Sequence, residues 1–393
     1  MKSTGGRRGA TILRFHETPI PRRIGELETP SLAVDLDILA HNLDVMASYT
    51  ALHGLSLRPH VKTHKSPRIA AEQVRLGAIG LTCATPREME VMSEVSRDLL
   101  LAHPPIGSAK LARLLTLPRE TRLTVALDSA TAVEQLASTA RIMDREVGVY
   151  VEIDMGMRRV GVATPKEAAD LARQVWRSPP LKYAGVAFYP GHIREPVREQ
   201  GPALERLSED LAAVLRVLEG EGLAPPVVSG GSTPAAWRAH EIEGLTEVRP
   251  GTYVYNDRTT AALDACSWDD CALTVLATVI STSVAGQVVV DAGSKALGRE
   301  PLRGTEGEGW GALLDRPELT VARMSEEHGI IERPRESDWS PRVGDMVRIV
   351  PNHVCYAVSL FDEVHGLRDD VVETSWPVDA RGRQPAPSSP VHR

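Results

Sequence analysis

The sequence predicts an α/β protein in which a (β/α)8 barrel of the TIM type is followed by a smaller, mostly β domain. The first observation is a regular alternation of eight short β-rich runs with helix-like stretches, and eight is the number of strands in a closed parallel barrel. The second is a change after Asp257, where β-rich runs separated by glycine turns continue without a long amphipathic helix. Periodicity alone leaves an open, doubly wound sheet as the alternative.

Each expected barrel strand is a short β-rich run that ends in a polar residue or a glycine. The stretches between them place apolar residues at helical spacing, as Leu204, Leu207 and Leu211 do. The expected barrel strands are 57–62, 80–84, 98–103, 123–128, 147–154, 184–189, 226–229 and 246–249, and the expected helices are 67–76, 86–95, 131–143, 165–176 and 202–218. In the second domain the expected strands are 272–281, 287–291, 346–351 and 371–376.

These elements divide the chain into four parts. An N-terminal extension, 1–28, precedes the barrel, 29–257, and the β domain follows at 258–380. The strand at 31–34 is a candidate member of the β domain although it precedes the barrel strands. The tail, 381–393, is rich in proline, serine and arginine and is expected to be disordered.

Composition excludes several classes of function. The 393 residues carry a net charge of −7, which argues against a general nucleic-acid binder. No apolar run is long enough for a transmembrane helix, and the N-terminus lacks the apolar stretch of a secretory signal. Four cysteines are too few for a disulfide scaffold. We therefore expect a cytoplasmic protein that acts on a small molecule, without a nucleic-acid or membrane partner.

Lysine is rare in this chain, because only seven of its 45 basic residues are lysines. Lys62 stands at the end of the first barrel strand, where barrels gather their functional residues. A partly buried lysine loses some of its preference for the charged form, and its amine can then form an imine with a carbonyl compound. A solvated lysine without chemistry would fit the same position.

Two loops follow the seventh and eighth strands, where barrels often hold a phosphate. The loop 229–234 offers Ser232 and Thr233 beside two glycines, and the loop 251–253 offers Gly251, Thr252 and Tyr253. Glycine amides and short hydroxyls suit an anion, although such loops also occur as ordinary turns. Together with an imine-forming lysine, they predict pyridoxal 5'-phosphate, which joins an aldehyde and a phosphate in one molecule.

Three further residues stand at strand ends and have two interpretations each. Arg159 could donate to the cofactor's phenolate oxygen or be a surface arginine. Tyr189 could face the ring or be a half-buried core residue, and His192 could belong to the substrate pocket or be a satisfied strand-end histidine. In the second domain, His353 and Cys355 are two residues apart, so on a strand both side chains would project from one face. Imidazole and thiolate suit Zn²⁺, but an isolated pair of this kind is a weak metal signal.

As an ordered set, these residues resemble a known family over nearly the whole chain, from Thr29 to Arg383. The matching motifs are Thr29-Pro30-Ser31-Leu32-Ala33-Val34-Asp35, Arg58-Pro59-His60-Val61-Lys62-Thr63-His64-Lys65, Asp154-x-Gly156-x-x-Arg159-x-Gly161, Tyr189-x-Gly191-His192, Ser229-Gly230-Gly231-Ser232-Thr233-Pro234, Arg249-Pro250-Gly251-Thr252-Tyr253, Asp291-Ala292-Gly293-Ser294-Lys295, Glu327-His328-Gly329 and Pro351-Asn352-His353-x-Cys355. The family is that of D-serine dehydratase and D-threonine aldolase, pyridoxal-phosphate enzymes of the alanine-racemase-like fold (fold type III).

The resemblance implies a homodimer in which Lys62 bears the cofactor, Arg159 and Tyr189 face its ring, and the two glycine loops hold its phosphate. In the dehydratase branch it implies zinc on His353 and Cys355. In the aldolase branch an aspartate typically replaces that cysteine, and the metal is Mn²⁺ or Mg²⁺. The cysteine of this chain therefore favours the dehydratase branch, closer to D-serine dehydratase.

We expect a pyridoxal-phosphate- and metal-dependent lyase that removes water from a D-configured β-hydroxy amino acid, such as D-serine or D-threo-3-hydroxyaspartate, to give a 2-oxo acid and ammonia. The nearest alternative is an aldolase that cleaves Cα–Cβ to a glycine-type product and an aldehyde, with His192 as the base on the β-hydroxyl. Two alternatives differ in class: a non-catalytic pyridoxal-phosphate-binding protein, and an amino-acid racemase, for which Tyr356 is the candidate second base.

Overall fold

The structure, a computed structural model, describes residues 22–303 and 309–384, which divide into two compact units. The barrel unit comprises 49–251, 263–265 and 379–384, and the β unit comprises 22–48, 252–262 and 266–378. Of the expected N-terminal extension and the expected disordered tail, 1–21 and 385–393 lie outside the described residues.

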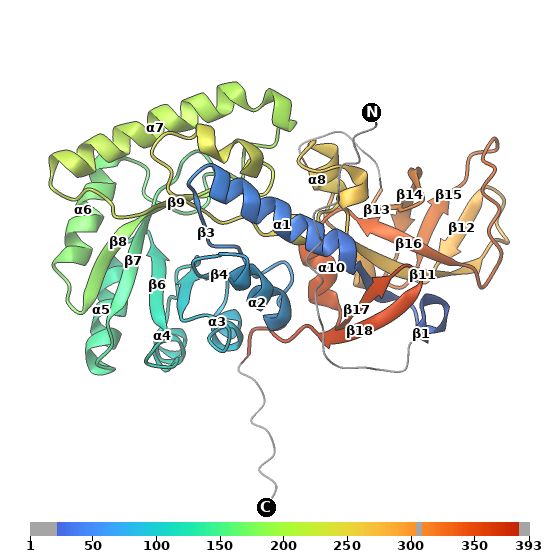
Figure 1. Cartoon of the computed structure of the whole chain (residues 1–393), viewed down its shortest axis with the longest axis horizontal. Coiled ribbons are helices and arrows are strands. Elements are labelled where there is room, and N and C mark those ends of the chain that lie inside the picture. Colours follow the sequence, from blue (N-terminus) through green and yellow to red (C-terminus); the bar gives the residue numbers. More distant parts are fainter. Residues whose placement is uncertain (1–21, 304–308, 385–393) are drawn as a thin grey trace, which may run out of the picture. The chain divides into compact units, whose positions relative to one another are not determined.

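Eight parallel strands form the sheet of the barrel unit, with helices on its outside (Figure 1). In spatial order they are β3 (Ser56–Leu57), β10 (Glu247–Val248), β9 (Val228–Gly230), β8 (Leu181–Ala187), β7 (Val147–Glu152), β6 (Arg122–Leu127), β5 (Asp98–Leu101) and β4 (Leu81–Cys83). The first and last strands of this order also join, because the Ile79 amide donates to the Leu57 carbonyl at 2.9 Å and the Thr82 amide to the Pro59 carbonyl at 2.9 Å. The predicted barrel is confirmed.

The helices of the barrel unit begin where the chain supplies local start signals. In α6, Pro165 occupies the first turn, the Thr164 hydroxyl accepts from the Glu167 amide, and the Glu167 carboxylate accepts from the Thr164 amide. Its buried face is built by Ala168, Leu171 and Val175, among others. The helices are α2 (Pro67–Arg75), α3 (Pro86–Met92), α4 (Ser108–Leu115), α5 (Ala130–Ile142), α6 (Pro165–Trp176) and α7 (Gly201–Gly220).

Side chains fill the inside of the barrel in layers. Leu100, Ala126, Tyr150 and Ala187, from four neighbouring strands, pack into one buried apolar cluster. Arg58 is also buried, and its guanidinium donates to Asp98 and to Glu247, each at 2.8 Å. This three-residue network links the segment after β3 with β5 and β10.

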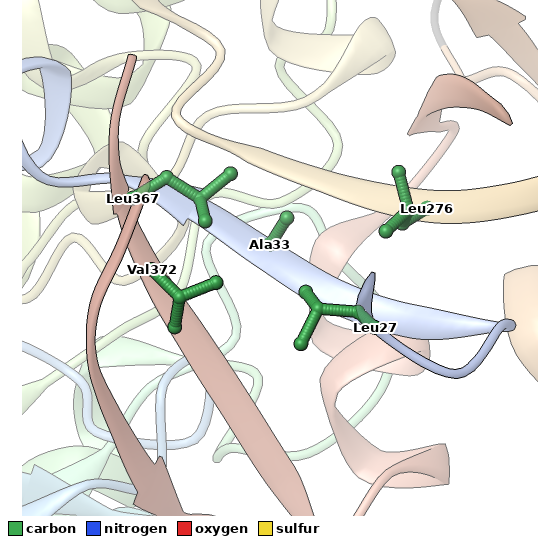
Figure 2. Packing of buried hydrophobic residues seen from close by; sticks show 5 residues of the cluster. All are labelled: Leu27, Ala33, Leu276, Leu367 and Val372. Atoms are coloured by element: carbon green, nitrogen blue, oxygen red, sulfur yellow. The ribbon is translucent and has the colours of Figure 1, made fainter. Parts of the chain in front are cut away.

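Antiparallel pairing dominates the β unit, with one parallel contact between β2 and β17. Its core includes Leu27, Ala33, Leu276, Leu367 and Val372, which Figure 2 shows gathered along β2. The ten strands run in the order β1 (Arg22–Arg23), β18 (Val371–Pro377), β17 (Glu363–Arg368), β2 (Ser31–Asp35), β11 (Leu273–Ser281), β12 (Gln287–Val290), β15 (Gly329–Glu332), β14 (Arg316–Met324), β13 (Gly311–Leu313) and β16 (Met346–Pro351), and β11 also pairs with β16.

Further helices complete the described chain. They are the α-helices α1 (Leu36–Leu52), α8 (Arg258–Ala262), α9 (Ser294–Leu297) and α10 (Val354–Leu360), and the 3-10 helices η1 (Ile24–Glu26), η2 (Val197–Glu199), η3 (Ala236–Glu241), η4 (Thr252–Val254) and η5 (Trp268–Asp270). Sequence periodicity missed α1, α4 and α10, as well as β13, β14, β15 and β17. Within the described residues, no helix has both the length and the apolarity needed to cross a bilayer.

Candidate active site

Lys62 lies in a turn beyond the first barrel strand rather than on the strand, because β3 ends at Leu57 and the last strand-like contact is the bridge from His60 to Thr82. Its side chain is half-buried, and its Nζ lies 5.8 Å from the centre of the Tyr189 ring. This amine forms no hydrogen bond or ion pair with any residue that the structure describes. A half-buried amine without a partner is free to attack a carbonyl carbon.

Lys65, three residues further on, has the opposite environment. Its Nζ donates to the buried Glu88 carboxylate at 2.5 Å, and Glu88 also accepts from the Ala84 amide. The Lys65 amine is therefore part of a structural ion pair. The contrast leaves Lys62 as the lysine of this turn whose amine is available to a ligand.

Two histidines flank Lys62, the partly buried His60 and the fully buried His64, and sequence reasoning gave neither a role. Burial first, and then the cation of Lys62, lowers the pKa of His60 well below its usual value, and the His60 Nδ1 accepts from the Lys62 amide at 3.4 Å. Burial lowers the pKa of His64 to about 3. The His64 Nδ1 accepts from the Ser66 amide at 3.1 Å, and its Nε2 faces the Gln73 amide oxygen at 3.2 Å. Both imidazoles are neutral at pH 7, so neither adds charge beside Lys62.

Tyr189 brings two of the predicted residues together, because the Arg159 guanidinium lies 4.8 Å from the centre of its ring while Lys62 lies over the same ring. Gly191 makes this ring position possible, since a Cβ there would be 2.1 Å from the Tyr189 Cε1. Tyr189 thus presents a flat aromatic surface between two cations, which suits an anionic aromatic ligand.

His192 is exposed and packs against the loop after β7. A Cβ on Gly156, whose φ is +108°, would lie 2.9 Å from the His192 Nε2. The glycine at 156 therefore allows the loop to approach the imidazole closely. An exposed imidazole at the barrel mouth can exchange protons with a ligand.

The loop after β9 is buried and contains a glycine in the left-handed region. Gly231 adopts a φ of +93°, and Ser232 and Thr233 are buried. Among the described residues, no hydrogen bond from the amides of Gly231, Ser232 or Thr233 is found. Buried amides without acceptors are costly unless a ligand satisfies them, and three in succession are suited to an anion.

Gly251 joins this loop from the end of β10. Its amide donates to the Thr233 hydroxyl at 3.2 Å, and a Cβ there would be 2.9 Å from the Thr63 hydroxyl and 3.0 Å from the His60 carbonyl. The amine of Lys62, the Tyr189 ring and the buried amides match the aldehyde, ring and phosphate of pyridoxal 5'-phosphate. Thr252 and Tyr253 lie in η4 of the β unit, where the Thr252 hydroxyl is 4.0 Å from the Cys355 sulfur.

His353 and Cys355 are not on a strand, which corrects the expected geometry. Strand β16 ends at Pro351, His353 is the N-cap of α10, and Cys355 lies in the first turn of that helix. The two side chains are nevertheless near enough for the charge of Cys355 to act on the imidazole. Burial lowers the pKa of His353, but the charge of Cys355 and the hydrogen bond that the imidazole donates to Asp257 outweigh burial and raise the pKa to about 10.

Asp257 is a residue of this site that sequence reasoning missed. Its Oδ2 lies 2.9 Å from the His353 Nδ1 and accepts from the Val354 amide, while its Oδ1 accepts from the Thr260 amide at 2.8 Å. A carboxylate on Nδ1 directs the other ring nitrogen towards a metal. No local signal pairs residues 96 positions apart. In the described part of the chain, no group of three or more metal-ligating side chains occurs, so the pair offers two ligands, an imidazole nitrogen and a thiolate.

Comparison with known proteins gives two family matches and full-length relatives. Residues 34–259 match the alanine racemase N-terminal domain, and 272–367 match a serine dehydratase domain. The chain is 31% identical to a D-threonine aldolase of Arthrobacter sp over 94% of this chain and 98% of that protein. It is 33% identical to the D-threo-3-hydroxyaspartate dehydratase of Delftia sp. (strain HT23), over 89% of this chain and 97% of that one.

A solved structure of a D-threo-3-hydroxyaspartate dehydratase superposes with a TM-score of 0.82 at 30% identity, covering 92% of this chain and 100% of that one. That structure is of a cysteine-to-alanine variant in the metal-free form. The barrel, the β unit and the relatives of matching length lead to one conclusion: this chain belongs to the D-serine dehydratase and D-threonine aldolase family of pyridoxal-phosphate-dependent lyases, with the alanine-racemase fold.

Proposed function

We propose that this protein eliminates water from a D-configured β-hydroxy amino acid, such as D-serine or D-threo-3-hydroxyaspartate, and so produces a 2-oxo acid and ammonia. The observation that carries the proposal is the pair of His353 and Cys355, with Asp257 bound behind the imidazole. A β-hydroxyl is a poor leaving group unless the departing oxygen is stabilised. A metal ion on this pair would stabilise it as a Lewis acid.

The cofactor site is proposed to consist of Lys62, Arg159, Tyr189, Ser232, Thr233 and Gly251, with Thr252 and Tyr253 following along the chain. Pyridoxal phosphate supplies an electron sink for negative charge at the substrate's Cα. The buried amides of 231–233 would hold the phosphate, and Tyr189 would orient the ring. Lys62 would hold the cofactor through its aldehyde, and the same amine is the candidate base for the substrate's Cα proton.

The metal is proposed to be zinc, because a thiolate ligand is soft and Mg²⁺ and Mn²⁺ prefer oxygen. Asp257 keeps the His353 ring in one orientation and leaves the Nε2 for the ion. The relative whose cysteine variant is described as metal-free supports a metal-binding role for the corresponding thiol here. Lewis-acid assistance to the β-hydroxyl is the chemistry that this ion would add.

Further proposals concern the setting of the enzyme. All four cysteines are free thiols, which agrees with a cytoplasmic location, and the negative net charge agrees with a small-molecule substrate rather than a nucleic acid or a membrane. We also propose a homodimer, on the family resemblance.

A second candidate is an aldolase that cleaves the Cα–Cβ bond of the same class of substrate. The match to a D-threonine aldolase over 94% of the chain favours it. In that reaction a base must take the proton of the β-hydroxyl, and the exposed His192 is the candidate. The cysteine at position 355 favours dehydration over this alternative.

Product analysis separates these reactions. The protein, loaded with pyridoxal phosphate and Zn²⁺, is incubated with D-serine, D-threonine and D-threo-3-hydroxyaspartate, and ammonia, 2-oxo acid and glycine are measured with and without a chelator. We expect ammonia and 2-oxo acid in equal amounts, and their loss on chelation. Glycine with an aldehyde would assign the aldolase, a change of configuration alone the racemase, and no turnover with bound cofactor the non-catalytic binder.

The metal site has a matched pair of variants on one helix. Cys355→Ala removes the thiolate and should lower elimination at least about 100-fold together with zinc content, because second-shell changes alone reach this magnitude. Ser359→Ala, one turn further along α10, removes an exposed hydroxyl that donates to the Cys355 carbonyl and should leave both unchanged. Full activity of the zinc-free Cys355→Ala protein would contradict the metal's role.

A further inference from the structure

Arg194 lies in the loop that follows β8, beyond Tyr189, and the function proposed above gives it no role. The Ile193 amide donates to the Pro190 carbonyl at 3.1 Å, which closes a tight turn. After this turn the Arg194 side chain folds back, and its Nε donates to the Gly191 carbonyl at 2.9 Å. One nitrogen of the guanidinium is therefore held by the loop itself.

The turn places this guanidinium beside the proposed cofactor site. Gly191 is buried against the Tyr189 ring, since a Cβ at position 191 would be 2.1 Å from the Tyr189 Cε1 and 2.7 Å from its Cζ. Lys62 and Arg159 lie over that same ring. The Arg194 Nε thus bonds to the backbone of the residue that packs directly on the ring.

No carboxylate pairs with the Arg194 guanidinium within the described residues, and the Gly191 carbonyl is the acceptor found there for its side chain. The neighbouring Glu195 carboxylate accepts from the Arg194 backbone amide at 2.9 Å instead. The Arg194 side chain is partly buried, so water solvates it incompletely. A partly buried cation without an anion is stabilised when a ligand supplies one.

Arg198, four residues further along the chain, provides a contrast. Its guanidinium donates to the Asp264 carboxylate at 2.8 Å and to the Glu199 carboxylate at 3.2 Å, and its side chain is 72% exposed. Arg198 therefore has its anions within the protein, whereas Arg194 keeps its terminal N–H groups for a ligand.

The reaction proposed above needs a group of this kind. Every amino-acid substrate carries an α-carboxylate, and D-threo-3-hydroxyaspartate carries a second carboxylate on its side chain. In the proposed site, Lys62, Arg159 and the amides of 231–233 serve the cofactor, and none of them is assigned to a carboxylate of the substrate. A guanidinium is planar and can bind a carboxylate through two parallel hydrogen bonds.

We propose that Arg194 binds a carboxylate of the amino-acid substrate. The bond from its Nε to Gly191 fixes one edge of the guanidinium, and the terminal N–H groups offer the other edge. Because the side chain is already held by the loop, it loses less conformational freedom when the substrate binds. The inference rests on the function proposed above, since it takes an amino acid as the substrate.

The test measures amino-acid binding to the full-length protein loaded with pyridoxal phosphate, as wild type and as Arg194→Gln. The initial change in the cofactor's absorption is recorded by stopped flow while the concentration of D-serine or D-threo-3-hydroxyaspartate is raised. We expect Arg194→Gln to raise the half-saturating concentration of at least one of them about 10- to 100-fold, because charge-assisted hydrogen bonds are lost. Cofactor affinity, measured by equilibrium dialysis, should stay unchanged.

The two amino acids distinguish the two carboxylates. Weaker binding of both assigns the α-carboxylate to Arg194, whereas weaker binding of D-threo-3-hydroxyaspartate alone assigns the carboxylate on its side chain. D-serinamide, in which an amide replaces the α-carboxylate, should bind equally to wild type and variant. Unchanged binding of both amino acids would overturn the proposal, and so would an equal loss for D-serine and D-serinamide, because Arg194 would then only support the loop.

Two further variants separate a specific contact from a general effect of charge. Arg198→Gln removes an arginine that already has acidic partners, and it should bind both amino acids like the wild type. Arg194→Lys keeps the positive charge without the planar fork and should recover part of the lost affinity. The same loss in Arg198→Gln as in Arg194→Gln would overturn the proposal.

The absorption change does not depend on which products follow. Glycine as the product would overturn the proposed elimination and leave the role of Arg194 in place. A wild-type protein whose absorption responds to none of these amino acids would overturn the proposed function and the role of Arg194 together.

Discussion

Lys62 and Lys65 are three residues apart, but their amines have different environments because their neighbours differ. The Lys65 amine donates to a buried carboxylate, Glu88, while the contact found for the Lys62 amine within the described residues is the face of the Tyr189 ring. A cation over an aromatic ring gains about 0.5–1 kcal/mol, much less than a buried ion pair can, so Lys62 gives up little when it binds a cofactor. The role proposed for Lys62 depends on the weakness of this interaction.

Replacing Lys62 by arginine tests that assignment. Lys62→Arg keeps the positive charge over Tyr189 but cannot bond covalently to an aldehyde. We expect borohydride to fix the cofactor to the wild-type chain, at position 62 on peptide mapping, and to fix none to the variant. Lys182→Arg, at an exposed position, should behave like the wild type. Labelling of the Lys62→Arg protein would remove Lys62 from this role.

The buried histidine beside this lysine predicts how stability depends on pH. The pKa of His64 is about 3 in the folded protein because of burial, against about 6.5 when unfolded. The unfolded chain therefore binds more protons between these values, and stability falls as pH drops below 6.5. From pH 7 to pH 5 this group alone should cost about 2 kcal/mol.

Urea unfolding at pH 7 and pH 5 checks this expectation. His64→Gln replaces the imidazole by a neutral side chain, so its stability should fall by about 2 kcal/mol less over this interval. His41→Gln, at a position where the side chain is 63% exposed, should fall as the wild type does. Equal falls in all three proteins would show that His64 takes up its proton without unfolding.

At the scale of elements, the loop after β9 shows how backbone conformation prepares a ligand site. Gly231 lies in the left-handed region at φ +93°, and an added Cβ would meet Val248 at 3.6 Å and the Arg249 amide nitrogen at 3.9 Å, both ordinary contacts. Gly231→Ala should therefore destabilise this loop conformation by about 1–2 kcal/mol through backbone strain, without a steric clash. Relaxing that strain turns the amides of 231–233 away from the anion that they would bind.

We expect Gly231→Ala to weaken pyridoxal phosphate binding at least tenfold, which equilibrium dialysis measures. Gly222→Ala is the matched control, because Gly222 also has a positive φ, +70°, and open space around it, beyond the end of α7. It should show a similar loss of stability with unchanged cofactor affinity. Equal affinities in the two variants would mean that the 231–233 loop does not hold the phosphate.

Other elements show why sequence patterns predicted some boundaries and missed others. Helix α6 has its expected bounds because Thr164, Pro165 and Glu167 are local start signals. Helix α10 occupies the segment in which the spacing of His353 and Cys355 suggests a strand, and no local side chain caps its start. Its first amide, on Val354, is capped by Asp257, a residue 97 positions away. A helix cap that comes from a residue far away in the sequence cannot be recognised from the local sequence pattern.

At the scale of the whole molecule, the barrel is closed around a buried network of charges. Arg58 bonds to Asp98 and Glu247, and its side chain is 5% exposed. Arg58→Met should lower the free energy of unfolding by about 3–5 kcal/mol, because two carboxylates lose their buried partner. Denaturant unfolding of the variant at pH 7 measures this loss.

Arg122 provides the comparison, since it pairs with the same Asp98 but its side chain is 73% exposed. Arg122→Met should cost less than about 1 kcal/mol, because solvent screens an exposed pair. Similar losses in the two variants would show that the network contributes no more than an ordinary surface ion pair.

The alternation of strands and helices, the barrel that follows from it, and the ordered motifs of the family can be predicted from the sequence, because they depend on local periodicity and on residues close in the chain. The different environments of the Lys62 and Lys65 amines and the Asp257 carboxylate beside the His353 ring become visible only in the folded protein. Those outcomes depend on burial and on partners far away in sequence, and burial sets the strength of a charge or a hydrogen bond only once the chain has folded.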